Sequence, residues 1–173
     1  MKDKVVEDIM VPVDEYPCIP DTLTIGDAVI EMTVQILRTK HLSLPRVALV
    51  FDEEFVDLRG MLRRRDIMRG LEPEFLISST LGYRRKLFTV SVDPNLSELS
   101  HEKLVAGLRK RAQRKVKDYM IPIPATINHD DHIMKAVCEM VDRDTSLLPV
   151  LRDGNVVGVV RSVDVLSEIA LIL

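Results

Sequence analysis

The hydrophobic positions of this chain follow the same order twice. Apolar residues recur every three or four positions from Ile25 to Ile36 and again from Ile133 to Met140, which predicts two amphipathic helices. Each of these segments is followed by a short apolar run, Val47–Phe51 in the first case and Leu147–Leu151 in the second. Runs of this length, rich in Val and Leu and ended by a turn, predict buried strands.

Each predicted strand is followed by a turn, a returning strand and a short helix. Arg152–Asn155 has the composition of a hairpin turn, and a longer loop that begins at Asp52 takes its place earlier in the chain. At the end of each repeat, a Gly, an Arg and an Asp follow one another at intervals of three residues. These residues are Gly60, Arg63 and Asp66 in the first repeat and Gly158, Arg161 and Asp164 in the second. The sequence therefore predicts two α/β units, each with an extended entry, a helix, a strand, a hairpin, a strand and a helix.

Polar residues mark the expected starts of the two longer helices. Thr24 and Asp27 have the spacing of a capping box, with Asp in place of the usual Glu. Asp130 or Asp131 is expected to cap the second helix. The segment His129–His132 is therefore interpreted as a turn and helix cap and not as a metal site, since the matching segment of the first repeat lacks such ligands.

The entries to the two units also match, and together these features resemble a known family. Asp8-Ile9-Met10 with Pro12 and Asp118-Tyr119-Met120 with Pro122 lie 110 residues apart. With Leu148-Pro149-Val150 and the paired Gly and Asp positions, they resemble the CBS domain, and the two copies resemble a tandem CBS pair (Bateman module). The resemblance implies an α/β fold of two β-α-β-β-α units packed sheet to sheet about a pseudo-twofold axis. It also implies a homodimer.

The repeats divide the chain into three parts. The expected boundaries are 1–69 for the first CBS unit, 70–115 for an inserted connecting segment and 116–173 for the second CBS unit. Within the insertion, Leu87–Val92 alternates weakly and predicts a strand, while Ser97–Val116 has the pattern of a helix.

The end of this predicted helix is strongly basic. Residues 103–117 hold seven Lys and Arg, whereas His101–Asp118 holds only two acidic residues. Three interpretations stay open: a surface for nucleic acid or an acidic partner, a funnel for phosphate, or a solvated face whose cations are favoured near a helix C-terminus. The last is preferred, and because no aromatic residues interleave, base stacking is not indicated.

The resemblance implies regulatory ligands rather than an obligatory cofactor. Members of the family bind adenosine-containing ligands such as AMP, ADP, ATP or S-adenosylmethionine in clefts between the two units. The aspartate of the closing pattern, here Asp66 and Asp164, then binds the ribose hydroxyls, because a carboxylate can accept two hydroxyl protons at once. Both aspartates are expected in the first turn of a helix, where the backbone N–H groups also favour phosphate.

The sequence departs from the family at the Thr or Ser of this pattern, which is Arg63 in the first repeat and Arg161 in the second. Two interpretations stay open. Each arginine either clamps phosphate with two hydrogen bonds, or it pairs with the aspartate three residues on or simply fills the cleft, which would abolish nucleotide binding. Two interpretations of Arg63-Arg64-Arg65 also stay open: the triplet makes the first repeat the more favourable for phosphate, or it is only a solvated helix start. Ser162 offers the second repeat a neighbouring hydroxyl.

The resemblance also implies where the adenine lies, against the extended entry and the inner strand of each unit. By position, these residues are Ile19, Pro20, Thr126, Ile127, Pro149 and Val150. Such residues also form an ordinary core, so each one alone is weak evidence for a binding site.

Composition narrows the class of protein. The chain has 173 residues, of which 46% are hydrophobic, and a net charge of −3, so it is neither a disordered chain nor a globally basic nucleic-acid binder. Its two cysteines have no zinc-ligand or disulfide spacing and suit a reducing compartment, which predicts a cytoplasmic protein. No apolar run approaches the length of a membrane span.

These features together predict a regulatory ligand-binding module, without catalytic residues, whose ligand changes the packing of the repeats and is sensed by a partner protein. Two alternatives stay open. One is a structural dimerisation module with its clefts filled by Arg63 and Arg161. The other is a module that binds nucleic acid or an acidic partner through its basic helix.

Overall fold

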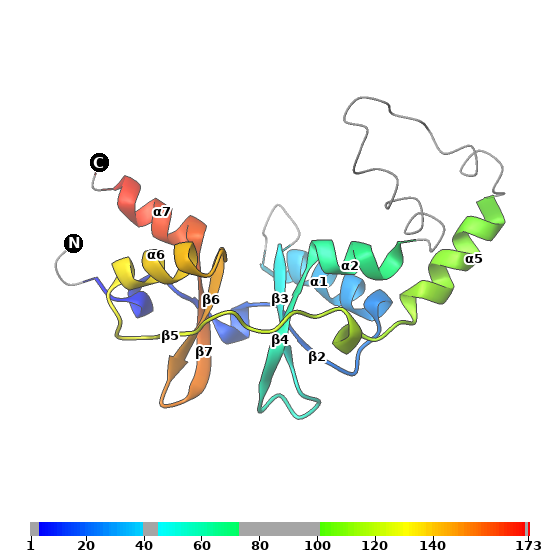
Figure 1. Cartoon of the computed structure of the whole chain (residues 1–173), viewed down its shortest axis with the longest axis horizontal. Helices are drawn as coiled ribbons and strands as arrows, with labels where there is room; N and C mark the ends of the chain where they lie inside the picture. Colours follow the sequence, from blue (N-terminus) through cyan, green and yellow to red (C-terminus); the bar gives the residue numbers. More distant parts are fainter. Residues whose placement is uncertain (1–3, 40–44, 73–100, 172) are drawn as a thin grey trace.

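The structure, a computed structural model, describes residues 4–39, 45–72, 101–171 and 173. Within these residues it contains two β-sheets and five α-helices (Figure 1). The first repeat contains β2 (Cys18–Pro20), α1 (Ile25–Thr39), β3 (Val47–Phe51), β4 (Leu58–Arg63) and α2 (Arg64–Leu71). The second contains β5 (Ile127–Asn128), α6 (Ile133–Asp142), β6 (Leu147–Arg152), β7 (Asn155–Arg161) and α7 (Ser162–Ala170). The predicted α/β order of elements is confirmed in both repeats.

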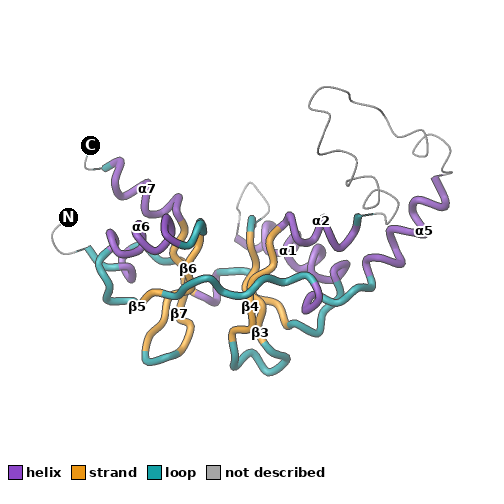
Figure 2. Tube along the Cα trace, viewed as in Figure 1, coloured by secondary structure: helices purple, strands orange, loops and turns teal. Residues whose placement is uncertain are grey.

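The two repeats share one strand topology. The entry strand is parallel to the inner strand, β2 to β3 and β5 to β6, and the hairpin partner is antiparallel to it. Val50 lies opposite Gly60, and Val150 lies opposite Gly158. The register then shifts by one residue at the same point of both hairpins. Figure 2 shows the strands of the two repeats next to each other at the centre of the molecule.

Alternation along the inner strands divides the core into layers. Ala48 and Val50 face the helices of the first repeat, whereas Val47 and Leu49 belong to a cluster that includes Leu147 and Val159 of the second sheet. The second repeat has its own helix-facing core around Leu148 and Val160. Because both faces of each sheet are covered, the inner strands appear in the sequence as continuous apolar runs.

The repeats exchange their entry segments. β1 (Val11–Pro12), at the start of the chain, pairs with β7 of the second repeat, with Val11 opposite Val159. In the matching place of the first repeat, Ile121 and Met61 exchange two backbone hydrogen bonds of 2.9 Å. Each sheet is therefore completed by backbone from the other repeat.

The short helical turns η1 (Val6–Asp8) and η3 (Val116–Asp118) follow the same exchange. Val6 N–H donates to Asp131 O and Val116 N–H donates to Leu23 O, both at 2.9 Å. The Val6 side chain is fully buried in the helix-facing core of the second repeat, and Val116 is fully buried in that of the first. Neither helix-facing core is complete without a residue from the other repeat.

The basic helix of the insertion, α5 (His101–Ala112), packs against α1 and α2 at the outer end of the first repeat (Figure 1). It ends at Ala112 and not at Val116 as predicted, because the backbone must turn there to bring Val116 into the core. The predicted strand Leu87–Val92 and the predicted start of the helix at Ser97 lie outside the described residues.

Several of the basic residues counted in the sequence hold the fold together. Arg111 Nε donates to Leu71 O at 2.8 Å, and Arg114 Nη1 donates to Gly70 O at 3.3 Å, so both bind carbonyls at the end of α2. Lys115 Nζ donates to Thr22 O at 2.9 Å. These three basic side chains therefore stabilise the fold by donating hydrogen bonds to backbone carbonyls.

Both longer helices are capped in the segments that the sequence predicts, but the capping residue of the second one differs. Asp27 N–H donates to Thr24 Oγ1 at 3.1 Å, and the Thr24 hydroxyl donates to the Asp27 carboxylate, so the first cap is confirmed. In the second repeat the cap lies within the predicted segment His129–His132, but the expected residue, Asp130 or Asp131, is wrong. The cap is His132, whose Nδ1 accepts from Met134 N–H at 3.2 Å. Asp131 instead accepts from Asn128 N–H and from Lys135, which fixes the turn before α6.

Candidate functional site

The last helix of each repeat begins with an arginine and an aspartate held together. β4 ends at Arg63, and α2 starts at the next residue, with Asp66 in its first turn. Arg63 N–H donates to Asp66 Oδ2 at 3.1 Å, and Arg161 N–H donates to Asp164 Oδ2 at 3.2 Å. The spacing of three positions therefore lets each aspartate in the first turn accept a hydrogen bond from the backbone N–H of the residue that precedes its helix.

The arginine side chains bind the same carboxylates. Arg63 donates from Nε to Asp66 Oδ2 at 2.8 Å and from Nη2 to Oδ1 at 3.0 Å. Arg161 donates to Asp164 in the same way, at 2.7 and 2.6 Å. Both pairs are bidentate, the geometry that gives Arg–carboxylate contacts their strength. The carboxylate oxygens that the resemblance assigns to ribose are thus bound to arginine in this structure.

The first of these pairs is the more deeply placed. The Asp66 side chain is fully buried, whereas Asp164 is 17% exposed. Burial by itself raises the pKa of Asp66, but hydrogen bonds and charge from Arg63 outweigh burial, so the pKa lies below its ordinary value. Arg69 Nη1 lies 3.7 Å from Asp66 Oδ1 and contributes to this lowering. Asp66 is therefore a charged, fully paired carboxylate at neutral pH.

The strand register places both pairs at the junction between the repeats. Arg63 lies opposite Val47, and Arg161 lies opposite Leu147. Side chains opposite each other share a face of the sheet, and Val47 and Leu147 both belong to the cluster between the two sheets. The residues that follow the crossed entry strands, 13–17 and 123–126, return past this junction to their own repeats.

One side chain at this junction was not foreseen from the sequence. Tyr16 is only 7% exposed, packs in the cluster between the sheets and donates its hydroxyl to Val47 O at 2.9 Å. Burial raises the pKa of Tyr16, while the charges of Arg161 and Asp164 act on this pKa in opposite directions. A length difference could have pointed to it, because the offset between repeats falls from 110 at Asp8 to 108 at Ile25.

The residues predicted to hold adenine lie in different layers. Ile19, Ile127 and Val150 are fully buried in the helix-facing cores. Pro149 is buried opposite Val159 in the sheet, Pro20 is half-buried and Thr126 is exposed. The structure thus brings each arginine to its aspartate, whereas adenine binding by these six residues stays a prediction.

Arg64 and Ser162, which follow the two arginines in the chain, are each held by a backbone hydrogen bond. Arg64 is exposed and its N–H donates to Arg46 O at 3.1 Å, while Ser162 is half-buried and its N–H donates to Ser146 O at 2.9 Å. Both residues are the first of their helices and directly follow Arg63 and Arg161 in the chain.

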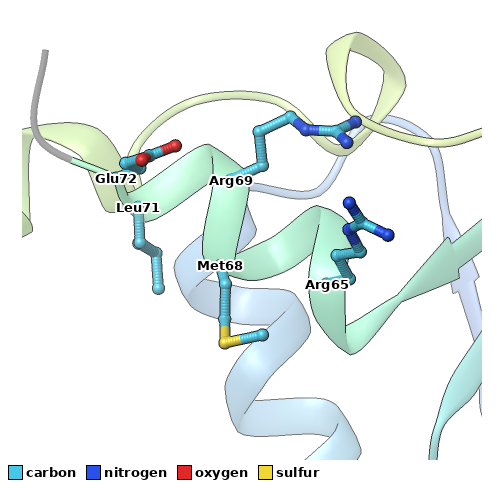
Figure 3. A pocket seen from close by; sticks show the side chains of 5 residues that line it. All are labelled: Arg65, Met68, Arg69, Leu71 and Glu72. Carbon is cyan, nitrogen blue, oxygen red and sulfur yellow. The ribbon is translucent and has the colours of Figure 1, made fainter. Parts of the chain in front are cut away.

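A shallow depression lies on the surface along α2. It is lined by Arg65, Met68, Arg69, Leu71 and Glu72. Figure 3 shows the guanidinium groups of Arg65 and Arg69 on one side of the helix, with Met68 and Leu71 pointing the other way. None of the predicted adenine-side residues lines it.

The described residues contain neither a cluster of metal ligands nor a membrane-spanning helix. No three His, Cys, Asp or Glu side chains there gather as they would around a metal ion. No helix in that part of the chain is long and apolar enough to cross a membrane.

Solved structures share this architecture at low sequence identity. CBSX2 in complex with AMP is 16% identical, with a TM-score of 0.59 and 97% of each chain covered; CBSX2 comes from Arabidopsis thaliana. The cytosolic domain of the Mg²⁺ channel MgtE in complex with ATP is 19% identical, with a TM-score of 0.60. The match covers 96% of this chain and 49% of that one. A CBS domain-containing protein from Kribbella flavida is 15% identical, with a TM-score of 0.65 and coverages of 96% and 98%.

The family comparison covers most of the chain. No curated protein matches this sequence. The model of the CBS domain matches residues 6–73 and again residues 116–171, the two ranges that hold the repeated elements. The chain therefore belongs to the CBS domain family, and it carries a tandem pair of these domains.

Proposed function

We propose that this chain is a regulatory module that binds an adenosine-containing nucleotide at the Arg–Asp pairs between its repeats. The observation that carries the proposal is the bidentate pair at the start of the last helix, present twice and each time at the junction with the other repeat. Structures of the same fold are described in complex with AMP or ATP, which supports this class of ligand.

The chemistry of binding follows from an exchange of partners. Ribose hydroxyls donate to the carboxylate of Asp66, whose position stays fixed by Arg63 N–H. The Arg63 side chain is 41% exposed, so it can leave the carboxylate and become a bidentate donor to a phosphate group. The ligand thus separates the Arg63 guanidinium from the Asp66 carboxylate and gives each a new partner, phosphate for the guanidinium and ribose for the carboxylate.

The crossed entry segments give such binding a way to act at a distance. Each repeat is completed by backbone from the other, and the segments that return past the Arg–Asp pairs are the same ones that cross. A ligand that favours one packing of the repeats shifts the population toward it, and a partner protein recognises that packing.

A thermal-shift series tests this proposal with AMP, ADP, ATP and S-adenosylmethionine. A ligand at 100 times its Kd adds about 2.7 kcal/mol, and at this size each kcal/mol raises Tm by about 2–4 °C. We expect a shift of several degrees that is reduced in Asp66→Ala or Asp164→Ala. Arg63→Ala or Arg161→Ala reduces the shift with the phosphate ligands more than with S-adenosylmethionine, which lacks phosphate. Arg59→Ala, on the same strand as Arg63 and half-exposed, is the matched control.

The pairing itself favours a second function, a structural module whose sites are filled by arginine. In both repeats the two carboxylate oxygens already accept hydrogen bonds from the neighbouring arginine. The same series separates the two functions. No shift in the wild type, with a shift gained in Arg63→Ala or Arg161→Ala, supports the structural module and contradicts nucleotide regulation by the natural chain.

We further propose that the chain forms a homodimer through the exposed faces of α2 and α7. Met68 is 64% exposed, and Leu166, at the same place in the second repeat, is 61% exposed, next to Val163 at 51%. Apolar side chains gathered in this way are typical of an interface. Light scattering after gel filtration is expected to give twice the chain mass, and Leu166→Glu the single mass. Val56→Glu, at a 72% exposed position of the hairpin loop, is the control, and a monomeric wild type contradicts the interface.

A further inference from the structure

The loop between β3 and β4 carries two apolar side chains into solvent. Phe55 is 51% exposed, and Val56 beside it is 72% exposed. Figure 1 shows this loop at the lower edge of the view, whereas α2 and α7 lie above the strands. β4 starts directly after the loop and ends at Arg63, so the loop and the first Arg–Asp pair lie at opposite ends of one strand. Neither the proposed nucleotide site nor the proposed dimer interface uses this surface.

Hydrogen bonds within the loop fix its shape. Asp52 Oδ1 accepts from Val56 N–H at 2.7 Å and from Asp57 N–H at 3.1 Å. Phe55 N–H donates to Asp52 O at 3.1 Å, and Asp52 N–H donates to Asp57 O at 3.0 Å. Arg59 Nη2 lies 3.5 Å from Asp57 Oδ2. The two exposed apolar side chains are therefore held in one arrangement before any partner binds, which lowers the entropic cost of binding.

The backbone of Phe55 is in a conformation that suits other residue types better. Its φ is 57°, in the left-handed region that bulky residues rarely adopt and that Gly or Asn adopts more readily. The ring lies 6.0 Å from the ring of Phe51, tilted by 30°, yet half of the Phe55 side chain stays exposed. Strained residues of this kind are found most often at functional positions.

The second hairpin makes the same connection without exposed apolar side chains. Phe51 pairs with Leu58, seven positions on, whereas Leu151 pairs with Val156, five positions on. The loop of the first repeat is therefore longer by two residues. The shorter loop turns on Asp153-Gly154, which are both exposed and both have positive φ. An aromatic side chain at the turn is thus not required to reverse the chain in this fold.

Acidic side chains surround the exposed pair. Glu53 and Glu54 come directly before Phe55, and both are exposed. Asp57 follows Val56 and is 65% exposed. Apolar side chains with acids around them are complementary to an apolar hollow that has Lys or Arg at its rim.

We infer that the β3–β4 loop is a preformed docking surface for a partner protein with an apolar hollow rimmed by Lys or Arg. Phe55 and Val56 enter the hollow, and Glu53 and Glu54 meet the cations at its rim. This surface goes beyond the proposed function, because it does not depend on nucleotide binding.

Peptides selected from a random phage-displayed library against the full wild-type chain test this surface, and fluorescence anisotropy then measures their affinities. We expect the selected peptides to combine Lys or Arg with aromatic or aliphatic residues. Phe55→Asn weakens their binding at least about tenfold, and both Glu53→Gln and added salt weaken it by a smaller factor. Val141→Asn, the same change at a 73% exposed position of α6, is the matched control and leaves binding unchanged.

Urea unfolding of Phe55→Asn separates docking from a purely structural role of the ring. Asn adopts a positive φ more readily, so the variant is expected to be no less stable than the wild type. A clear drop in its unfolding midpoint assigns Phe55 to packing on Phe51 and overturns the proposal. Selection of no peptide that distinguishes the wild type from Phe55→Asn also overturns it. Loss of the homodimer in Val56→Glu overturns it too, because the loop would then join two copies of the chain. None of these outcomes bears on nucleotide binding.

Discussion

Replacing Val6 or Val116 with Asp is expected to unfold both repeats together. Each of these valines is fully buried in the core of the other repeat, among apolar side chains. A buried, unpaired charge combined with the lost apolar contacts costs more than about 4 kcal/mol, a large part of the 5–15 kcal/mol that stabilises a typical domain. Urea unfolding followed by circular dichroism measures the loss.

Val56 provides the matched control for this experiment, because it is 72% exposed in the loop of the first hairpin. Val56→Asp is expected to change the free energy of unfolding by less than about 0.5 kcal/mol. If Val6→Asp were as stable as Val56→Asp, the N-terminal turn would not belong to the core of the second repeat, and the exchange of entry segments would be wrong.

Replacing Gly60 or Gly158 with Ala is expected to force the crossed segments away from their sheets. A Cβ added to Gly60 would lie 2.5 Å from Ile121 O, and one added to Gly158 would lie 2.6 Å from Val11 O. Both contacts are with backbone, which cannot move aside as a flexible side chain does. The shift would also weaken the hydrogen bonds between Met61 and Ile121, so we expect a loss of about 2–4 kcal/mol in the free energy of unfolding.

Gly107→Ala is the comparison that gives this result its meaning. Gly107 lies inside α5, and a Cβ there would meet only the far end of the Arg111 side chain. Alanine is favoured over glycine in a helix interior by about 0.5–1 kcal/mol, so this variant is expected to be slightly more stable than the wild type. Equal stabilities of Gly158→Ala and Gly107→Ala in urea unfolding would contradict the close approach of Val11 to β7.

Much of the fold could be predicted because its signals are local and occur twice. The apolar spacing from Ile133 to Met140 and the continuous run Val47–Phe51 each determine an element by its own residues. The aspartates at 66 and 164 could be placed at helix starts for the same reason, since three residues separate each from the end of a strand.

The exchange of entry segments could not be predicted, because it depends on contacts between residues far apart in the chain. Val11 and Pro12 form a strand of only two residues, and nothing in their sequence shows that their partner is Val159 rather than a strand of their own repeat. The same holds for the end of α5 at Ala112, where the burial of Val116 overrides a pattern that would continue the helix.

The site was predictable in its residues but not in their pairing. The sequence placed Arg63 and Asp66 at one helix start but left open whether the arginine binds phosphate or carboxylate, because a guanidinium suits either group equally well. The structure shows the carboxylate pair. Tyr16 escaped notice because its importance comes from the crossing path of residues 13–17, which brings it beside the second repeat.

Hydrogen exchange of the wild type with and without saturating ATP tests the central claim most directly, that a nucleotide bound between the repeats acts on their packing. We expect slower exchange at the start of α2 and also in the crossed segments, residues 5–12 and 116–122, since these complete the opposite repeats. Exchange that ATP leaves unchanged throughout, or slows at α2 but not in the crossed segments, would contradict the claim.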